Sequence, residues 1–208
     1  NRNLHISGGA ADVAFGITNS ATGTAATDGF SITVNNPTPD VSIRQRENNA
    51  MIFYTNNAER MRIDATGAIT KPLQPAFLIA NAAAQDNVGD SDTIVFATEI
   101  FDQNSDVSSN TFTAPVTGRY FLNAGLRIDN MVSGTTHHSP KIVTSNREFR
   151  NILETSSNIT YHHFHMSALA DMDAGDTAFV RFGQSGGSAG ADVPDDPNRT
   201  HFSGFLVC

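Results

Sequence analysis

Residues 110–128 read NTFTAPVTGRYFLNAGLRI and carry more information about the fold than any other stretch of the sequence. Residues 111–113 are predicted to form a short strand. Pro115 ends it, because proline has no amide hydrogen to donate to a β-ladder. At Gly118, which closes the connection, we expect the positive φ that glycine accepts readily. A second, longer strand is predicted over residues 119–128.

The predicted long strand has two faces of different character, since alternate side chains of a strand point to opposite sides. One face is apolar and is predicted to lie in the core: Tyr120, Leu122, Ala124, Leu126 and Ile128. The other face is mixed: Phe121, Asn123, Gly125 and Arg127. A half-apolar second face indicates burial against a surface outside the domain. We therefore expect Phe121 and Arg127 at a subunit interface.

The same stretch resembles the central signature of the complement C1q and tumour necrosis factor superfamily. The matching residues are Phe112, Ala114, Pro115, Gly118 and Tyr120. Leu122 stands where the family more often has an aromatic residue. Further matches follow in the family's order at residues 75–77, 93–96, 174–177 and 202–206. The resemblance covers residues 75–207 and implies a jelly-roll sandwich that assembles as a compact homotrimer.

Composition limits the possible functions. The 208 residues include 13 Lys and Arg against 21 Asp and Glu, a formal net charge of −8. Proteins that bind a phosphate backbone present a basic surface, so we expect no nucleic-acid partner. No apolar run has the length of a membrane span, and we expect no membrane insertion. The single cysteine, Cys208, excludes an internal disulfide. Because the sequence begins with Asn1, we expect it to be the end of a longer protein.

Residues 1–70 contain short predicted strands that each have one apolar face. These strands are predicted at residues 4–6, 13–17, 30–34, 41–43, 51–54 and 61–63. They are too short to bury their apolar faces in a monomeric core, so we expect an interwoven, trimeric β shaft. Residues 56–67, NNAERMRIDATG, resemble a segment that recurs in bacteriophage tail-fibre and tail-spike proteins before a C-terminal head domain.

A connector with two prolines, residues 71–75, separates this shaft from a predicted head domain at residues 76–208. Strands of the head are predicted at residues 76–80, 93–101, 109–114, 118–129, 141–144, 148–153, 159–170, 176–182 and 200–207. Short turns and both termini of the head should lie at one end of the sandwich. The long loops should lie at the other end, where binding functions usually reside.

Six residues of the predicted long loops are candidates for contact with a receptor: His137, His138, Asn158, Asp192, Asp195 and Asp196. The three aspartates could also hold a Ca²⁺ ion, which takes oxygen ligands. Their spacing is that of no known calcium loop, which favours a solvated acidic turn.

Residues 159–170, ITYHHFHMSALA, form the predicted strand richest in chemically active side chains. His162, Phe164, Met166, Ala168 and Ala170 make the better core face. Tyr161, His163 and His165 lie on the opposite face, which in the resembled fold lies against the three-fold axis of a trimer. Three copies of His163 and His165 could hold one transition metal ion such as Fe, Zn or Ni. The alternative is a polar interface of packed or water-bonded histidines.

The sequence contains no nucleophile elbow, phosphate-binding glycine loop or zinc-protease motif, so we expect no enzyme activity. The two resemblances together predict a homotrimeric bacteriophage tail-fibre tip. Such a tip belongs to the virion, acts outside cells, joins other tail proteins and binds a bacterial glycan or outer-membrane protein. Three alternatives stay open: a trimerisation clamp only, a secreted C1q-like recognition module, or a glycan-cleaving spike, which needs two carboxylates across a groove.

Overall fold

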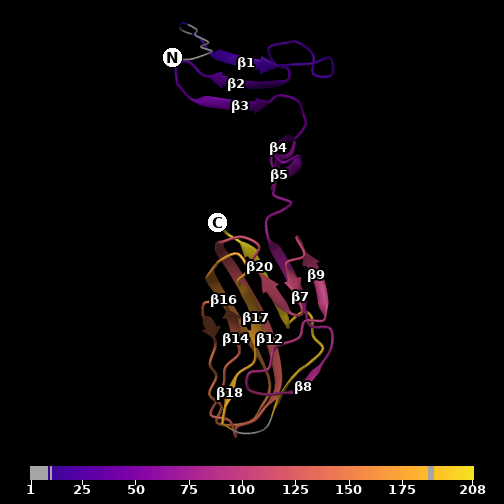
Figure 1. The fold of residues 1–208 in the computed structure, drawn as a ribbon, viewed down its shortest axis with the longest axis vertical. Coiled ribbons are helices and arrows are strands. Elements are labelled where there is room, and N and C mark those ends of the chain that lie inside the picture. Colours follow the sequence, from indigo (N-terminus) through magenta and orange to yellow (C-terminus); the bar gives the residue numbers. More distant parts are fainter. Residues whose placement is uncertain (1–8, 10, 187–189) are drawn as a thin grey trace. The chain divides into compact units, whose positions relative to one another are not determined.

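The computed structural model describes residue 9 and residues 11–186 and 190–208. Regular structure in this part of the chain consists of β-strands alone, which confirms the predicted all-β class. None of the described residues forms a helix that is long and apolar enough to cross a membrane. The chain divides into two compact units, Asn1–Pro72 and Leu73–Cys208 (Figure 1).

The first unit contains two three-stranded sheets, β1-β2-β3 and β4-β5-β6. Their strands are β1 (Val13–Ile17), β2 (Phe30–Val34), β3 (Val41–Gln45), β4 (Met51–Thr55), β5 (Ala58–Ile63) and β6 (Ile69–Thr70). The strands β1 to β5 overlap the predicted strands, and β6 is not among the predicted ones. The strand predicted at residues 4–6 lies outside the described residues. The strands pair with one another within one chain. An interwoven shaft instead requires pairing between chains, and trimerisation of this unit stays a prediction.

The second unit is a sandwich of two antiparallel sheets. The smaller sheet has the order β10-β11-β17-β14-β15, and the larger one the order β8-β19-β12-β20-β7-β9, with β16 paired to the other edge of β12. The smaller sheet consists of β10 (Val107–Ser108), β11 (Thr111–Thr113), β17 (Thr177–Arg181), β14 (Lys141–Thr144) and β15 (Glu148–Arg150). The larger sheet consists of β8 (Gln85–Val88), β19 (Ala191–Val193), β12 (Gly118–Met131), β20 (His201–Leu206), β7 (Ala76–Ala80), β9 (Thr98–Asp102) and β16 (Ile159–Met172). A further short ladder joins β13 (His137–His138) to β18 (Gln184–Ser185).

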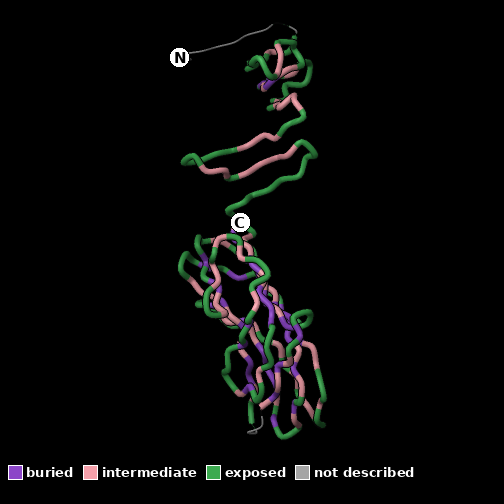
Figure 2. Tube along the Cα trace, turned by 90° about the vertical axis from the view of Figure 1, so that its right-hand side faces the viewer, coloured by how far each residue is buried: buried purple, intermediate pink, exposed green. Residues whose placement is uncertain are grey.

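The core lies between the two sheets, where Figure 2 shows the buried part of the second unit. The predicted core face of β12 is confirmed, because Tyr120, Leu122, Ala124, Leu126 and Ile128 are all fully buried. On β16, Phe164, Met166, Ala168 and Ala170 are buried as predicted, and His162 is half-buried. Aromatic rings link the sheets: Phe77 of β7 stacks on Phe112 of β11 with centroids 4.7 Å apart.

The ends of the sandwich are arranged as predicted. The amide of Arg119, next to the 115–118 turn, donates to the carbonyl of Cys208 at 2.7 Å, and the amide of Leu206 donates to Pro75 at 3.0 Å. Both termini of the unit therefore lie beside this turn. The predicted positive φ at Gly118 is wrong. Glycine is needed there because a Cβ atom would lie 2.7 Å from the carbonyl oxygen of Cys208.

Two parts of the predicted strand map are also wrong. The single strand expected at residues 93–101 is replaced by β9, which begins only at Thr98, and β8 precedes it at residues 85–88. Ile94 and Phe96 are nevertheless core residues, and the Ile94 amide donates to the carbonyl of Val180 at 3.0 Å. The apolar pattern of this segment thus results from burial in the core and not from a regular β-strand. The 182–200 connection, expected as one loop, contains β18 and β19.

Candidate functional site

The outer face of the larger sheet is the candidate functional site. An apolar row crosses this face, because Phe121 of β12 pairs with Leu169 of β16 on one side and with Phe205 of β20 on the other. Leu169 is 58% and Phe205 48% exposed, and the rings of Phe121 and Phe205 are 5.6 Å apart. The chain thus leaves three large apolar side chains of its main sheet in contact with solvent.

A shallow, mainly apolar hollow of about 810 Å³ continues this row toward β7 and β9. Its lining is formed in part by the apolar residues Leu78, Ile100, Phe101, Phe121 and Phe205. The polar residues Asn123, Asn198 and His201 line it as well. Such a contiguous apolar surface is typical of a protein–protein contact.

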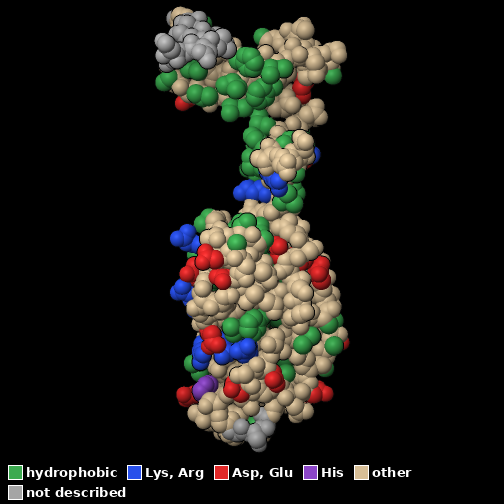
Figure 3. All heavy atoms as spheres, in the orientation of Figure 1, with side chains coloured by type: hydrophobic (Ala, Val, Ile, Leu, Met, Phe, Trp, Pro, Cys, Tyr) green, Lys and Arg blue, Asp and Glu red, His purple; other side chains and the backbone are tan. Residues whose placement is uncertain are grey.

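Charged side chains form a paired network at the other end of the face. Figure 3 shows acidic and basic side chains beside each other on the second unit. Arg127 binds Asp129 at 2.8 Å and Asp196 at 3.1 Å, and Arg199 binds Asp196 at 2.5 Å. Burial alone would raise the pKa of Asp196, but hydrogen bonds from Arg199 and Arg127 outweigh burial and hold that pKa below its ordinary value. Asp196 is therefore ionised at neutral pH.

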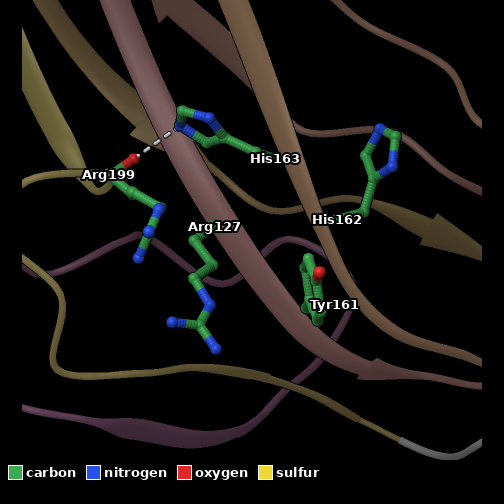
Figure 4. A pocket seen from close by; sticks show the side chains of 5 residues that line it. All are labelled: Arg127, Tyr161, His162, His163 and Arg199. Carbon is green, nitrogen blue, oxygen red and sulfur yellow. Dashed lines mark hydrogen bonds between the residues drawn. The ribbon is translucent and has the colours of Figure 1, made fainter.

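A hollow of about 340 Å³ lies over this network, and Arg127, Tyr161, His162, His163 and Arg199 line it (Figure 4). The guanidinium carbon of Arg127 lies 5.7 Å from the centroid of the Tyr161 ring, within the range of a cation–π contact. The residues predicted for a subunit interface, Phe121, Arg127, Tyr161, His163 and His165, thus share one sheet face. Whether another subunit covers that face stays a prediction.

Histidines from two strands gather at the centre of the face. His163 and His165 have ring centroids 4.2 Å apart. His165 on β16 and His201 on β20 both pair with Gly125 of β12. A Cβ atom on Gly125 would lie only 2.6 Å from the Cε1 atom of His201. Sequence reasoning missed His201, because only the register of β20 against β12 brings it beside the other two.

The hydrogen bonding of His163 defines its tautomer. Its Nε2 atom lies 2.8 Å from the carbonyl oxygen of Arg199, which can only accept, so Nε2 carries the hydrogen and Nδ1 keeps a lone pair. Burial lowers the pKa of His163 and of His201. Among the described residues, no three His, Cys, Asp or Glu side chains are grouped so that one chain alone could hold a metal ion.

The structure corrects the expected placement of His138. This side chain is fully buried rather than exposed on a loop. Its Nε2 atom lies 2.9 Å from the Thr135 hydroxyl, which itself donates to the carbonyl of Val132 at 3.0 Å. Nε2 therefore donates to Thr135, while Nδ1 is buried without a hydrogen-bond partner in the described structure. His138 cannot contact a receptor without rearrangement, and burial lowers its pKa.

The other predicted receptor contacts differ in accessibility. Asn158 is exposed, with its Oδ1 accepting from the Ser133 amide at 2.9 Å, and Asp195 is exposed as well. His137 is half-buried in the β13–β18 ladder.

Two of the three aspartates of the predicted calcium site have partners within the chain. Asp192 accepts from the Asn87 amide at 2.9 Å and from the Asn130 side chain at 2.7 Å. Asp196 is buried in its arginine pairs. Both carboxylates therefore have hydrogen-bond or ion-pair partners in the chain, and the calcium site stays a prediction.

Comparison with known proteins places this geometry in a family. A family model described as the C1q domain matches residues 76–207. The chain is similar to the globular domain of zebrafish complement 1qA protein, with 16% identity over 65% of this chain and 98% of that chain, at a TM-score of 0.46. It is also similar to murine APRIL, with 12% identity over 64% of this chain and 99% of that chain, at a TM-score of 0.49. No curated protein matches the sequence.

The buried His138 predicts acid sensitivity. Its pKa is 6.5 when unperturbed and lower in the folded protein. Above about pH 6.5 both states are neutral and stability is complete. As the pH falls below this value, the unfolded chain takes up the proton first, and the free energy of unfolding should fall by at most about 1.4 kcal/mol per pH unit until the native pKa is reached.

Urea unfolding at several pH values from 8 to 5 measures this dependence. The variant His138→Phe should flatten the profile, because it removes the titrating ring and leaves the Thr135 hydroxyl with its bond to Val132. His137→Asn, at the adjacent half-buried position, is the matched control. A profile that His138→Phe leaves unchanged would contradict the assignment.

Proposed function

The chain belongs to the C1q domain family, whose members are commonly trimeric, non-enzymatic recognition modules, and we propose that it is the homotrimeric tip of a bacteriophage tail fibre that binds a receptor on the host surface. The observation that carries the trimer is the uncovered apolar row Leu169–Phe121–Phe205 and the adjoining hollow. Exposing these side chains to water does not stabilise a single chain. Burying them between copies stabilises an oligomer by about 25 cal/mol per Å² of apolar surface.

The proposed place in a tail fibre is supported by the resemblance of residues 56–67 to a recurring tail-fibre segment. In the structure, β5 covers half of this segment, and Asp64 organises the turn that follows. Its Oδ1 atom accepts hydrogen bonds from the amides of Thr66 and Ala68 at 2.8 and 2.9 Å. A compact hairpin of this kind suits a linker between a fibre and its head, where it would join other virion tail proteins outside the host cell.

Receptor contact is assigned to the loops at the end of the sandwich opposite the termini. Among the residues predicted for these loops, Asn158 and Asp195 are exposed, and His137 is half-buried. The net charge of −8 disfavours direct attraction to an anionic lipopolysaccharide. Hydrogen-bonding loops therefore suit an uncharged glycan or an outer-membrane protein better. Three equal tips would raise avidity without strengthening any single contact.

One observation also favours a metal at the three-fold axis of the proposed trimer. Histidines that ligate metals usually donate their other ring N–H to a carbonyl or carboxylate. His163 donates its Nε2–H to the carbonyl of Arg199, so that the lone pair of Nδ1 could coordinate a metal ion. We propose that His163 and His165 of three copies together bind Fe, Zn or Ni, for which imidazole is a suitable ligand.

The trimer is tested by Phe121→Asp. The variant places one carboxylate per copy in the middle of the apolar row, where assembly would remove it from water. It should therefore be monomeric or unfolded, while the unmodified chain has three times the monomer mass. Ile152→Asp is the control, because Ile152 is an exposed apolar residue that follows β15 of the opposite sheet. Sedimentation equilibrium gives the masses. A trimeric Phe121→Asp variant, or a monomeric unmodified chain, would contradict the proposed trimer.

Host binding is tested with bacterial cells and their purified surface glycans. The fluorescently labelled chain should bind a subset of strains, and Asn158→Ala with Asp195→Ala should weaken binding several-fold without changing the mass of the trimer. A trimer that binds neither cells nor glycans would indicate that the chain serves only as a trimerisation clamp. Shortening of the polysaccharide during incubation indicates a glycan-cleaving enzyme.

The metal is tested by elemental analysis of the purified trimer. Close to one transition metal ion per trimer is expected, together with a lower melting temperature after chelation. His163→Gln should lose the ion, and His137→Gln should keep it. A metal-free trimer whose melting temperature is unaffected by chelator leaves the histidines as a polar interface only.

A further inference from the structure

The β1–β3 sheet of the first unit, which lies outside the C1q domain, has three rows of side chains on one face. Its strands pair in register, so that Phe15, Ile32 and Ile43 are directly opposite one another. The rows on either side continue the same face: Val13, Val34 and Val41, and then Ile17, Phe30 and Gln45. Only Gln45 among these residues is polar, and none is charged.

This apolar face is the solvent-exposed one. Val41 is 67%, Ile43 58% and Ile17 54% exposed. Figure 3 shows hydrophobic side chains gathered over β1–β3. A sheet with one wet face normally presents its polar residues to water and buries its apolar ones. The polarity of this sheet is reversed.

The opposite face confirms the reversal. Ser31 and Thr33 of β2 are 5% and 2% exposed. Arg46 donates to the Ser31 hydroxyl at 3.3 Å, and Arg44 donates to Asn35 at 3.0 Å. On the central strand of this part of the chain, the polar residues Ser31 and Thr33 are thus buried, while Ile32 and Val34 of the apolar face are 40% and 46% exposed.

We propose that this apolar face is an interface between copies of the chain, in which three β1–β3 sheets pack face to face and keep their strand pairing within each chain. The inference rests on the trimer of the proposed function, because the second unit would tether three first units at a high effective concentration. An uncharged face of Val, Ile and Phe fits an identical apolar face, and it offers a polar or charged partner nothing to bind.

This arrangement differs from an interwoven shaft in one testable respect. The ladder bonds of β2 are already satisfied by β1 and β3 of the same chain. Assembly then adds side-chain packing without new strand pairing. Ile32, in the middle row and on the central strand, should lie closest to its counterparts in the other copies.

Cysteine cross-linking of the full chain tests the proposal. Cys208 is first replaced by serine, and a new cysteine is introduced either by Ile32→Cys on the apolar face or by Ser42→Cys, which points to the opposite face of β3. Mild oxidation should give covalently linked dimers with Ile32→Cys and none with Ser42→Cys. Sedimentation equilibrium of both variants is measured in parallel.

The two measurements separate the outcomes. A trimeric mass with no cross-link at Ile32→Cys, or with equal cross-linking at both positions, overturns the packing of the first unit and leaves the trimer of the second unit intact. A monomeric mass overturns the proposed trimer itself. Binding of the unmodified chain to phosphatidylcholine vesicles, lost in Ile32→Asn but kept in Leu73→Asn, would identify a lipid surface as the occupant and also overturns the proposal.

Discussion

Strand β12 is hydrogen-bonded along both of its edges, to β16 on one side and to β20 and β19 on the other, and the second unit depends on this constraint. A strand with both edges occupied can interact further only through its two faces. The inner face is filled by Tyr120, Leu122 and their neighbours, all fully buried. On the outer face, Leu169 and Phe205, which pair with Phe121 of β12, are exposed, so the candidate site arises from the position of β12 in the sheet.

Glycines along this strand and its neighbour connect the packing to the site. Gly125 gives His201 room, since a Cβ atom there would lie 2.6 Å from the imidazole. Gly204 on β20 does the same for the core, where a Cβ atom would lie 2.8 Å from Leu122 and 2.9 Å from Phe77. Gly125 therefore makes room for His201 on the outer face, whereas Gly204 makes room for core side chains on the inner face.

Both units of the chain expose organised apolar faces, and both proposals use this shared property. In the second unit the row contains Leu169, Phe121 and Phe205, and in the first it contains Phe15, Ile32 and Ile43. Isolated exposed apolar residues are common on proteins, but registered rows across adjacent strands are not accounted for by chance exposure. Charged pairs, such as those between Asp196 and its two arginines, lie beside the row in the second unit rather than within it.

The sequence by itself determined the class of fold, the alternation of β12 and β16, and the end of the sandwich at which the termini lie. Alternation of apolar and polar residues predicts a strand, and proline predicts the end of one. Both predictions follow from the conformations open to neighbouring residues, so they need no knowledge of the rest of the fold. Only the tertiary structure decided which distant residues meet. The burial of His138, the pairing of Asp196 with Arg127 and Arg199, and the approach of His201 to His163 and His165 depend on strand register and loop packing. No local pattern encodes these, because they are set by contacts between segments that are far apart in the chain.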